Sequence, residues 1–99
     1  MLLSPNFYHD QESSKKAISQ IQEFLDDFPN SEYSKDADKL INELRTRLAE
    51  KNMETGKLYV KLKAYDSAIV SYKIVVNEFY DTKFFNDANM EIILSLIHI

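Results

Sequence analysis

Apolar residues recur at intervals of three and four along most of this chain, the spacing of one face of an α-helix. Between positions 10 and 28 they form a single stripe opposite charged and amide side chains: Ala17, Ile18, Ile21, Phe24, Leu25 and Phe28. We therefore predict an amphipathic helix over residues 10–28. Pro29 should end it, because proline disfavours helical geometry in the preceding residue and cannot donate its own amide. Ser31 or Ser34 is expected to cap the next helix.

A second apolar stripe begins after Tyr33 and continues without a proline or a turn pair to Lys63. Its members are Ala37, Leu40, Ile41, Leu44, Leu48, Met53, Gly56, Tyr59, Val60 and Leu62. We interpret residues 33–63 as one helix of roughly 46 Å, at 1.5 Å per residue. A break near Asn52 is the alternative.

Two shorter helices should follow. A turn at Lys63-Ala64-Tyr65 leads to Asp66, a plausible N-cap, and to a helix that ends at Tyr80-Asp81-Thr82. The last helix should start at about Phe84 and run to the end of the chain. No segment alternates with the two-residue period of a strand, and a single glycine is too few for the turns of a sheet. The fold class predicted is all-α.

Composition narrows the possible functions. The chain has 99 residues, so it is one small domain or a piece of a larger one. A net charge of -4 provides no basic field for binding nucleic acid. The absence of cysteine excludes a disulfide, a thiolate metal site and a cysteine nucleophile from this chain. The start, Met1 to Pro5, lacks the features of a secretory signal, and the apolar run 92–99 is too short to span a bilayer.

The sequence repeats itself at a constant offset of 51 residues, the separation of Ala17 and Ala68. The same offset pairs Ile18 with Ile69, Phe28 with Phe79, Asp36 with Asp87, Ala37 with Ala88 and Ile41 with Ile92. The tetratricopeptide period is about 34 residues, so the offset exceeds it by about one helix length, which the long central helix absorbs. We place the repeat copies at about 10–41 and 50–92.

The tetratricopeptide pattern supports this interpretation. Its small and aromatic positions correspond to Gly56, Tyr59, Tyr65, Ala68 and Tyr72. Small residues let two antiparallel helices approach closely, and tyrosine rings fill the spaces between neighbouring pairs. The sequence departs from the pattern in having Val75 at a small-residue position and Lys63 in place of the usual turn glycine. We predict a tetratricopeptide-like helical-hairpin solenoid with one long central helix, a single segment over residues 1–99.

Short motifs follow one another in a characteristic order: Leu3-Ser4-Pro5, Asp10-Gln11, Lys16-Ala17-Ile18, Phe28-Pro29-Asn30-Ser31-Glu32-Tyr33, Leu40-Ile41-Asn42-Glu43-Leu44-Arg45, Leu48-Ala49-Glu50-Lys51, Lys57-Leu58-Tyr59 and Ala64-Tyr65-Asp66-Ser67-Ala68-Ile69. This order resembles the BamD family, the outer-membrane lipoproteins of the bacterial β-barrel assembly machinery. The resemblance implies a periplasmic scaffold at the outer membrane that binds other subunits of an assembly complex and unfolded outer-membrane proteins. It also implies that this chain is an interior fragment, with the lipid anchor upstream.

Catalytic chemistry finds little support in the sequence. His9 and His98 have no carboxylate or serine at a spacing that suggests a triad or a ligand set. The acidic pairs Asp26-Asp27 and Asp36-Asp38 are better explained as solvated helix surface. We expect no catalytic residue, no cofactor and no metal. A small helical hydrolase or metal enzyme is the rival from another class, and it would require His9 or His98 to act.

A protein-binding face is expected on the first helix of the tetratricopeptide hairpin. Tyr59, Tyr65 and Tyr72 occupy packing positions, so we assign them to the core. The opposite face would be lined by Glu50, Met53, Lys57, Val60 and Lys61. Lysine and arginine exceed acidic residues along this helix, which favours either an acidic partner or an ordinary solvated surface.

Both ends of a solenoid fragment should be unfinished. Leu2, Leu3 and the stripe Ile92, Ile93, Leu96 and Ile97 lack the polar character of terminal repeats, which predicts self-association or fraying. The predicted function is non-catalytic protein binding, in outer-membrane protein assembly. The alternative is a generic tetratricopeptide adaptor that binds a peptide or a partner protein in the cytoplasm.

Overall fold

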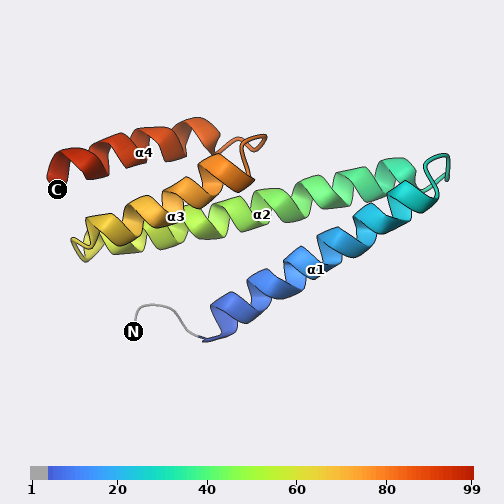
Figure 1. The fold of residues 1–99 in the computed structure, drawn as a ribbon, viewed down its shortest axis with the longest axis horizontal. Coiled ribbons are helices and arrows are strands. Elements are labelled where there is room, and N and C mark those ends of the chain that lie inside the picture. Colours follow the sequence, from blue (N-terminus) through green and yellow to red (C-terminus); the bar gives the residue numbers. More distant parts are fainter. Residues whose placement is uncertain (1–4) are drawn as a thin grey trace. The chain divides into compact units, whose positions relative to one another are not determined.

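The computed structural model describes the backbone of residues 5–99 and the side chains of residues 11–99. It contains α1 (Pro5–Asp27), α2 (Ser34–Lys61), α3 (Tyr65–Glu78) and α4 (Phe85–His98), and no strand among the described residues (Figure 1). The all-α, tetratricopeptide-like fold class is thereby confirmed. The chain forms two compact units, and the boundary between them along the chain lies between Leu44 and Arg45.

The central helix α2 is continuous over 28 residues, a length of about 42 Å. The alternative, a break near Asn52, is wrong. The buried Asn52 amide donates a hydrogen bond to the Leu48 carbonyl at 2.9 Å, so this polar side chain is satisfied within the helix. Thr55 likewise donates to the Lys51 carbonyl at 2.9 Å.

The first unit contains α1, a tight turn and the start of α2. α1 begins at Pro5, five residues before the predicted start, and proline is well tolerated in the first turn because its missing amide needs no partner there. The predicted capping by Ser34 is wrong. Ser34 is the first residue of α2, and its hydroxyl donates to the carbonyls of Phe28 and Pro29 at 3.4 and 3.2 Å. Ser31 accepts a hydrogen bond from the Tyr33 amide, one residue before α2 begins.

The second unit contains the rest of α2 together with α3 and α4. Gly56 lies so close to the ring of Tyr72 that a Cβ at this position would be 2.5 Å from two ring atoms. Ala68 on α3 and Ala88 on α4 are fully buried, as small residues between helices should be. The core of this unit is Leu48, Ala49, Met53, Ala68, Ile69, Tyr72, Val75, Phe79 and Ala88.

The turn from α2 to α3 ends the long helix with a pair of backbone hydrogen bonds. The Ala64 amide donates to the Tyr59 carbonyl at 2.8 Å, and the Lys63 amide donates to the Val60 carbonyl at 3.0 Å. This pattern is the Schellman motif, which places the residue before its last one in the left-handed region, and that residue, Lys63, has a φ of 60°. The predicted Asp66 cap is wrong: α3 begins at Tyr65, after Ala64, with no side-chain cap.

The turns after α1 and α3 have matching hydrogen bonds at the offset of 51 residues. Phe28 and Phe79 each donate to the carbonyl four residues earlier, at 2.9 Å in both turns. The amides of Ser31 and Thr82 then donate to the carbonyls of these phenylalanines, at 3.2 and 3.1 Å. The Ser34 amide donates to the Ser31 carbonyl, and at the same offset the Phe85 amide donates to the Thr82 carbonyl. The extents of the two repeat copies, 10–41 and 50–92, stay a prediction.

The described part of the chain has apolar side chains on its surface at α4. Ile93, Leu96 and Ile97 are 54%, 57% and 72% exposed, whereas Ile92 is half-buried. Leu2 and Leu3, the other predicted unfinished end, lie outside the described residues. None of the described helices combines the length and the apolar sequence that a membrane crossing requires.

Candidate protein-binding surface

The five residues of the predicted binding face lie on α2, within the second unit. Glu50, Lys57 and Lys61 are exposed, and Val60 is half-buried. Met53 is only 4% exposed, so it belongs largely to the core. The structure therefore presents the charged members of the set to solvent and uses the sulfur-containing one mainly for packing.

Two of these residues line a small pocket between α2 and α4. The volume of the pocket is about 160 Å³, and it is lined by Met53, Lys57, Phe84, Asp87, Met90 and Glu91. We call it the α2–α4 pocket. Glu50, Val60 and Lys61 do not line it.

Sequence reasoning missed the contribution of α4 to this pocket. The missed residues are Phe84, Asp87, Met90 and Glu91. The offset of 51 residues could have indicated three of them, because it matches Phe84, Asp87 and Glu91 with Tyr33, Asp36 and Leu40 at the start of α2. The same offset indicates that the first residues of α4 are the repeat counterparts of the first residues of α2.

The lining of the α2–α4 pocket combines apolar groups with opposite charges. Met53 and Phe84 contribute apolar surface, and Met90 is 57% exposed at the rim. Lys57 lies opposite two carboxylates, Asp87 and Glu91. Such a site suits an apolar side chain of another polypeptide whose neighbouring polar groups reach the charged rim.

Tyr72 lies in the core beside this pocket rather than in it. Its side chain is fully buried, and its hydroxyl is without a hydrogen-bond partner. Burial raises the pKa of Tyr72 to about 12, and the negative charge of Glu91 adds to the shift. The assignment of Tyr72 to packing agrees with its position against Gly56.

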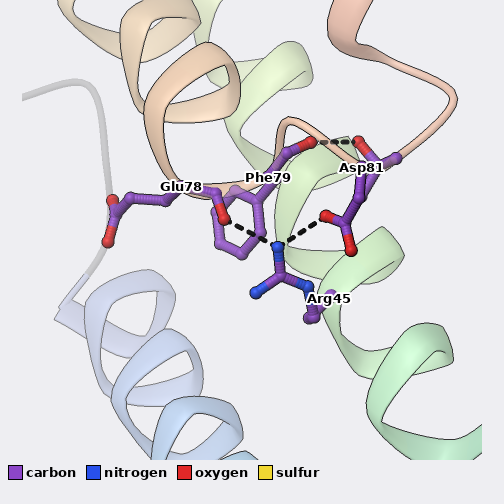
Figure 2. A network of polar contacts seen from close by, with 5 residues as sticks. Arg45, Glu78, Phe79 and Asp81 are labelled. Carbon is purple, nitrogen blue, oxygen red and sulfur yellow. Dashed lines mark hydrogen bonds and ion pairs between the residues drawn. The ribbon is translucent and has the colours of Figure 1, made fainter. Parts of the chain in front are cut away.

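A polar network holds the turn that leads into α4. The Arg45 guanidinium donates to the Glu78 carbonyl at 2.9 Å and to Asp81 Oδ1 at 2.6 Å (Figure 2). It also lies over the Phe79 ring, 5.5 Å from the centroid. The hydrogen bond from Arg45 holds the pKa of Asp81 below its usual value. Arg45 therefore acts within the fold rather than as a free cation for a partner.

A second hollow surface lies within the first unit, between α1 and the start of α2. Its volume is about 430 Å³, and its lining is predominantly apolar: Ala17, Gln20, Ile21, Phe24, Tyr33, Asp36, Ala37 and Leu40. We call it the α1–α2 groove. Tyr33 and Leu40 are 60% and 45% exposed at this groove.

Of the two histidines, His98 has a described side chain, and it packs against an aromatic ring. His98 stacks on Tyr65, with ring centroids 5.3 Å apart and planes inclined by 15°. The side chain of His9 lies outside the described part of the chain. Within that part, no three histidine or acidic side chains come together as a metal site would require.

Comparisons with known proteins agree with one another. The family described as "YfiO: Outer membrane lipoprotein" matches residues 2–94. A protein of Vibrio cholerae serotype O1, named outer membrane protein assembly factor BamD, is 31% identical over 74 residues. That alignment covers 75% of this chain and 31% of the relative. The chain thus spans about a third of the length of the relative.

Proposed function

Since the chain belongs to the YfiO family of outer membrane lipoproteins, we propose that it is a non-catalytic protein-binding segment that takes part in the assembly of outer-membrane proteins. The curated relative is named as an assembly factor, which supports a role in assembly rather than in catalysis. The segment would act by presenting helices to other polypeptides. Its working location would be the periplasmic side of the outer membrane.

The α2–α4 pocket carries the proposal. It joins Met53 and Lys57, two residues of the predicted binding face, to Phe84, which directly precedes α4, and to three residues of α4. Apolar surface surrounded by charged side chains is typical of the sites where protein interfaces place an anchoring side chain. Neither a cofactor nor a metal is required for this role.

Two kinds of partner fit this role: folded subunits of an assembly complex, and unfolded outer-membrane proteins. The comparisons do not favour the alternative function, a peptide-binding adaptor of the cytoplasm. Glu50, Val60 and Lys61 lie outside the pocket and are proposed to extend the contact along α2.

Site-specific photocrosslinking in cells tests this function. A photoreactive amino acid is placed at Lys57 or Met90, both at the α2–α4 pocket, and at Val70, which is exposed on α3 and does not line it. We expect crosslinks from the two pocket positions to envelope proteins, either assembly subunits or outer-membrane proteins in transit. Crosslinked products are identified by mass spectrometry.

Two charge reversals, one at the pocket and one away from it, test the role of the pocket. Lys57→Glu adds a third carboxylate beside Asp87 and Glu91 and should weaken crosslinking from Met90 about tenfold, as expected for a loss of about 1.4 kcal/mol of binding energy. Lys73→Glu makes the same change of charge at an exposed position of α3. This matched control should leave the crosslinking from Met90 unchanged. Equal crosslinking from Val70, or crosslinks to cytoplasmic proteins alone, would contradict the proposal.

A further inference from the structure

The Tyr72 hydroxyl is a hydrogen-bonding group in the interior of the second unit that no other group uses. It is the one buried side-chain polar atom without a hydrogen-bond partner within the described part of the chain. The whole Tyr72 side chain is buried, so water does not replace the missing partner. A buried hydroxyl in this condition destabilises a fold, and such groups occur in native proteins mainly where they have a function.

The hydroxyl end of Tyr72 is close to both helices that form the α2–α4 pocket. On α2, the ring atom that carries the hydroxyl, Cζ, would lie 2.5 Å from a Cβ at Gly56. On α4, Glu91 is near enough for its negative charge to contribute to the raised pKa of Tyr72. Glu91 lines the pocket, and so does Met53, one helical turn before Gly56. The unused donor is therefore beside the pocket.

The pocket also contains hydrogen-bond acceptors that this donor does not use. The Glu91 carboxylate is half-buried and accepts no hydrogen bond from the Tyr72 hydroxyl. Asp87, one helical turn earlier on α4, lines the same pocket. The donor and these acceptors are close to one another but are not joined, so a group with both an acceptor and a donor could bridge them.

This arrangement selects among the side chains that a partner could insert. Lysine and arginine carry donors only, so neither can accept a hydrogen bond from Tyr72. A carboxylate can accept one, but it would lie beside Asp87 and Glu91, and like charges in an interface repel. A carboxamide is neutral, its oxygen accepts, and its NH2 group donates to a carboxylate.

We infer that the α2–α4 pocket binds a glutamine side chain of the partner polypeptide, an inference that rests on the proposed function. The carboxamide oxygen accepts a hydrogen bond from Tyr72, and the NH2 group donates to Glu91. The two methylenes pack against Met53 and Phe84 in a pocket of about 160 Å³, which suits one side chain. Met53 is unbranched and flexible, so it shifts to let the carboxamide reach the hydroxyl. Tyr72 thereby determines which side chain the pocket prefers.

Tyr72→Phe separates this role from a role in packing, because it removes the hydroxyl and keeps the ring. Without a partner polypeptide, the loss of an unpaired buried hydroxyl should raise the urea concentration at the midpoint of unfolding. Tyr65→Phe removes a hydroxyl from a tyrosine that does not line the pocket, and this matched control should leave peptide binding unchanged. A lower midpoint for Tyr72→Phe would assign the hydroxyl to the fold and overturn the inference.

Binding is measured by NMR titration of the 99-residue chain with a blocked pentapeptide that has a glutamine between two pairs of threonines. The methyl signals of Met53 and Met90 report on the pocket. Matched peptides have methionine, which is similar in length but lacks the carboxamide, or glutamate. The wild-type chain should bind the glutamine peptide about tenfold more tightly than either, as expected for the added hydrogen bonds. Tyr72→Phe should bind the glutamine and methionine peptides equally.

Three further outcomes would overturn the inference. If the glutamine peptide binds the wild-type pocket no better than the methionine peptide, the pocket does not recognise a carboxamide, although the proposed function stands. If the preference for glutamine survives Tyr72→Phe, other groups recognise it. If no peptide shifts the pocket signals, the pocket does not bind a glutamine side chain, and crosslinking from Lys57 and Met90 in cells decides the proposed function by itself.

Discussion

Single residues decide how closely the helices of the second unit approach one another. Gly56 is the only glycine of the chain, and it lies inside a helix, where glycine costs about 1 kcal/mol relative to alanine. The close approach of the Tyr72 ring explains its presence there, because an added Cβ would lie 2.5 Å from that ring. The tetratricopeptide pattern predicted a small residue at this position, but only the structure shows which ring it accommodates.

Gly56→Ala should therefore destabilise the protein although alanine is the better helix former. Overpacking costs about 1–3 kcal/mol, and the approach of two ring atoms to 2.5 Å favours the upper part of that range, about 2–3 kcal/mol. The gain in helix propensity returns about 1 kcal/mol, so we expect a net loss of about 1–2 kcal/mol. Urea unfolding followed by circular dichroism measures it. Tyr72→Phe keeps the ring and should not relieve the clash, whereas Tyr72→Leu in the Gly56→Ala background should recover part of the loss. An unchanged or higher stability of Gly56→Ala would refute this account of the contact.

At the scale of elements, the sequence predicted the helices better than the ways in which they begin and end. The apolar stripes located the four helices of the described residues, and Pro29 correctly marked the end of the first. The predicted caps at Ser34 and Asp66 failed because cap preference is a local tendency that turn geometry overrides. Here the chain leaves α2 through a Schellman motif, which sets the start of α3 at Tyr65.

Lys63→Gly should stabilise this turn. The left-handed conformation of Lys63 costs a residue with a Cβ about 1 kcal/mol, and glycine avoids that cost. We expect a gain of about 0.5–1 kcal/mol in the free energy of unfolding, measured by urea titration. Lys63→Ala, which removes the lysine side chain but keeps the Cβ, is the control and should show no gain. A gain of equal size in both variants would assign the effect to the lysine side chain instead.

At the scale of the whole molecule, the sequence predicted the fold more completely than it predicted the candidate binding site. Composition and periodicity sufficed for the all-α class and the long α2, because helix formation depends on local spacing. The α2–α4 pocket could not be predicted in full, because it depends on which face of α4 turns toward Met53 and Lys57. The role of Arg45 was hidden for the same reason: its partners Glu78 and Asp81 are more than thirty residues away in the chain.

The contact between Arg45 and Asp81 makes part of the overall stability dependent on pH. The pKa of Asp81 is lower in the folded protein than in the unfolded chain, so its contribution is present at neutral pH and disappears as the pH falls below about 4. Because Asp81 is about half exposed, we expect no more than about 1 kcal/mol. Asp81→Asn should be less stable than the wild type by this amount at pH 7, and the difference should vanish near pH 2.

Unfolding titrations at several pH values check this prediction. Glu54→Gln removes one negative charge at another exposed site and serves as the control, with no comparable pH-dependent difference. A difference between Asp81→Asn and the wild type that persists at the lowest pH would mean that the asparagine perturbs the turn itself.

The matching turns at residues 28–34 and 79–85 have a consequence for the gene that encodes this protein. Because their hydrogen bonds coincide at an offset of 51 residues, DNA exchange between the two coding stretches would add or remove 51 codons and keep the reading frame. The new junction would again be a phenylalanine-led turn between two helices. Unequal recombination could thus lengthen or shorten the array by a whole structural unit in one event.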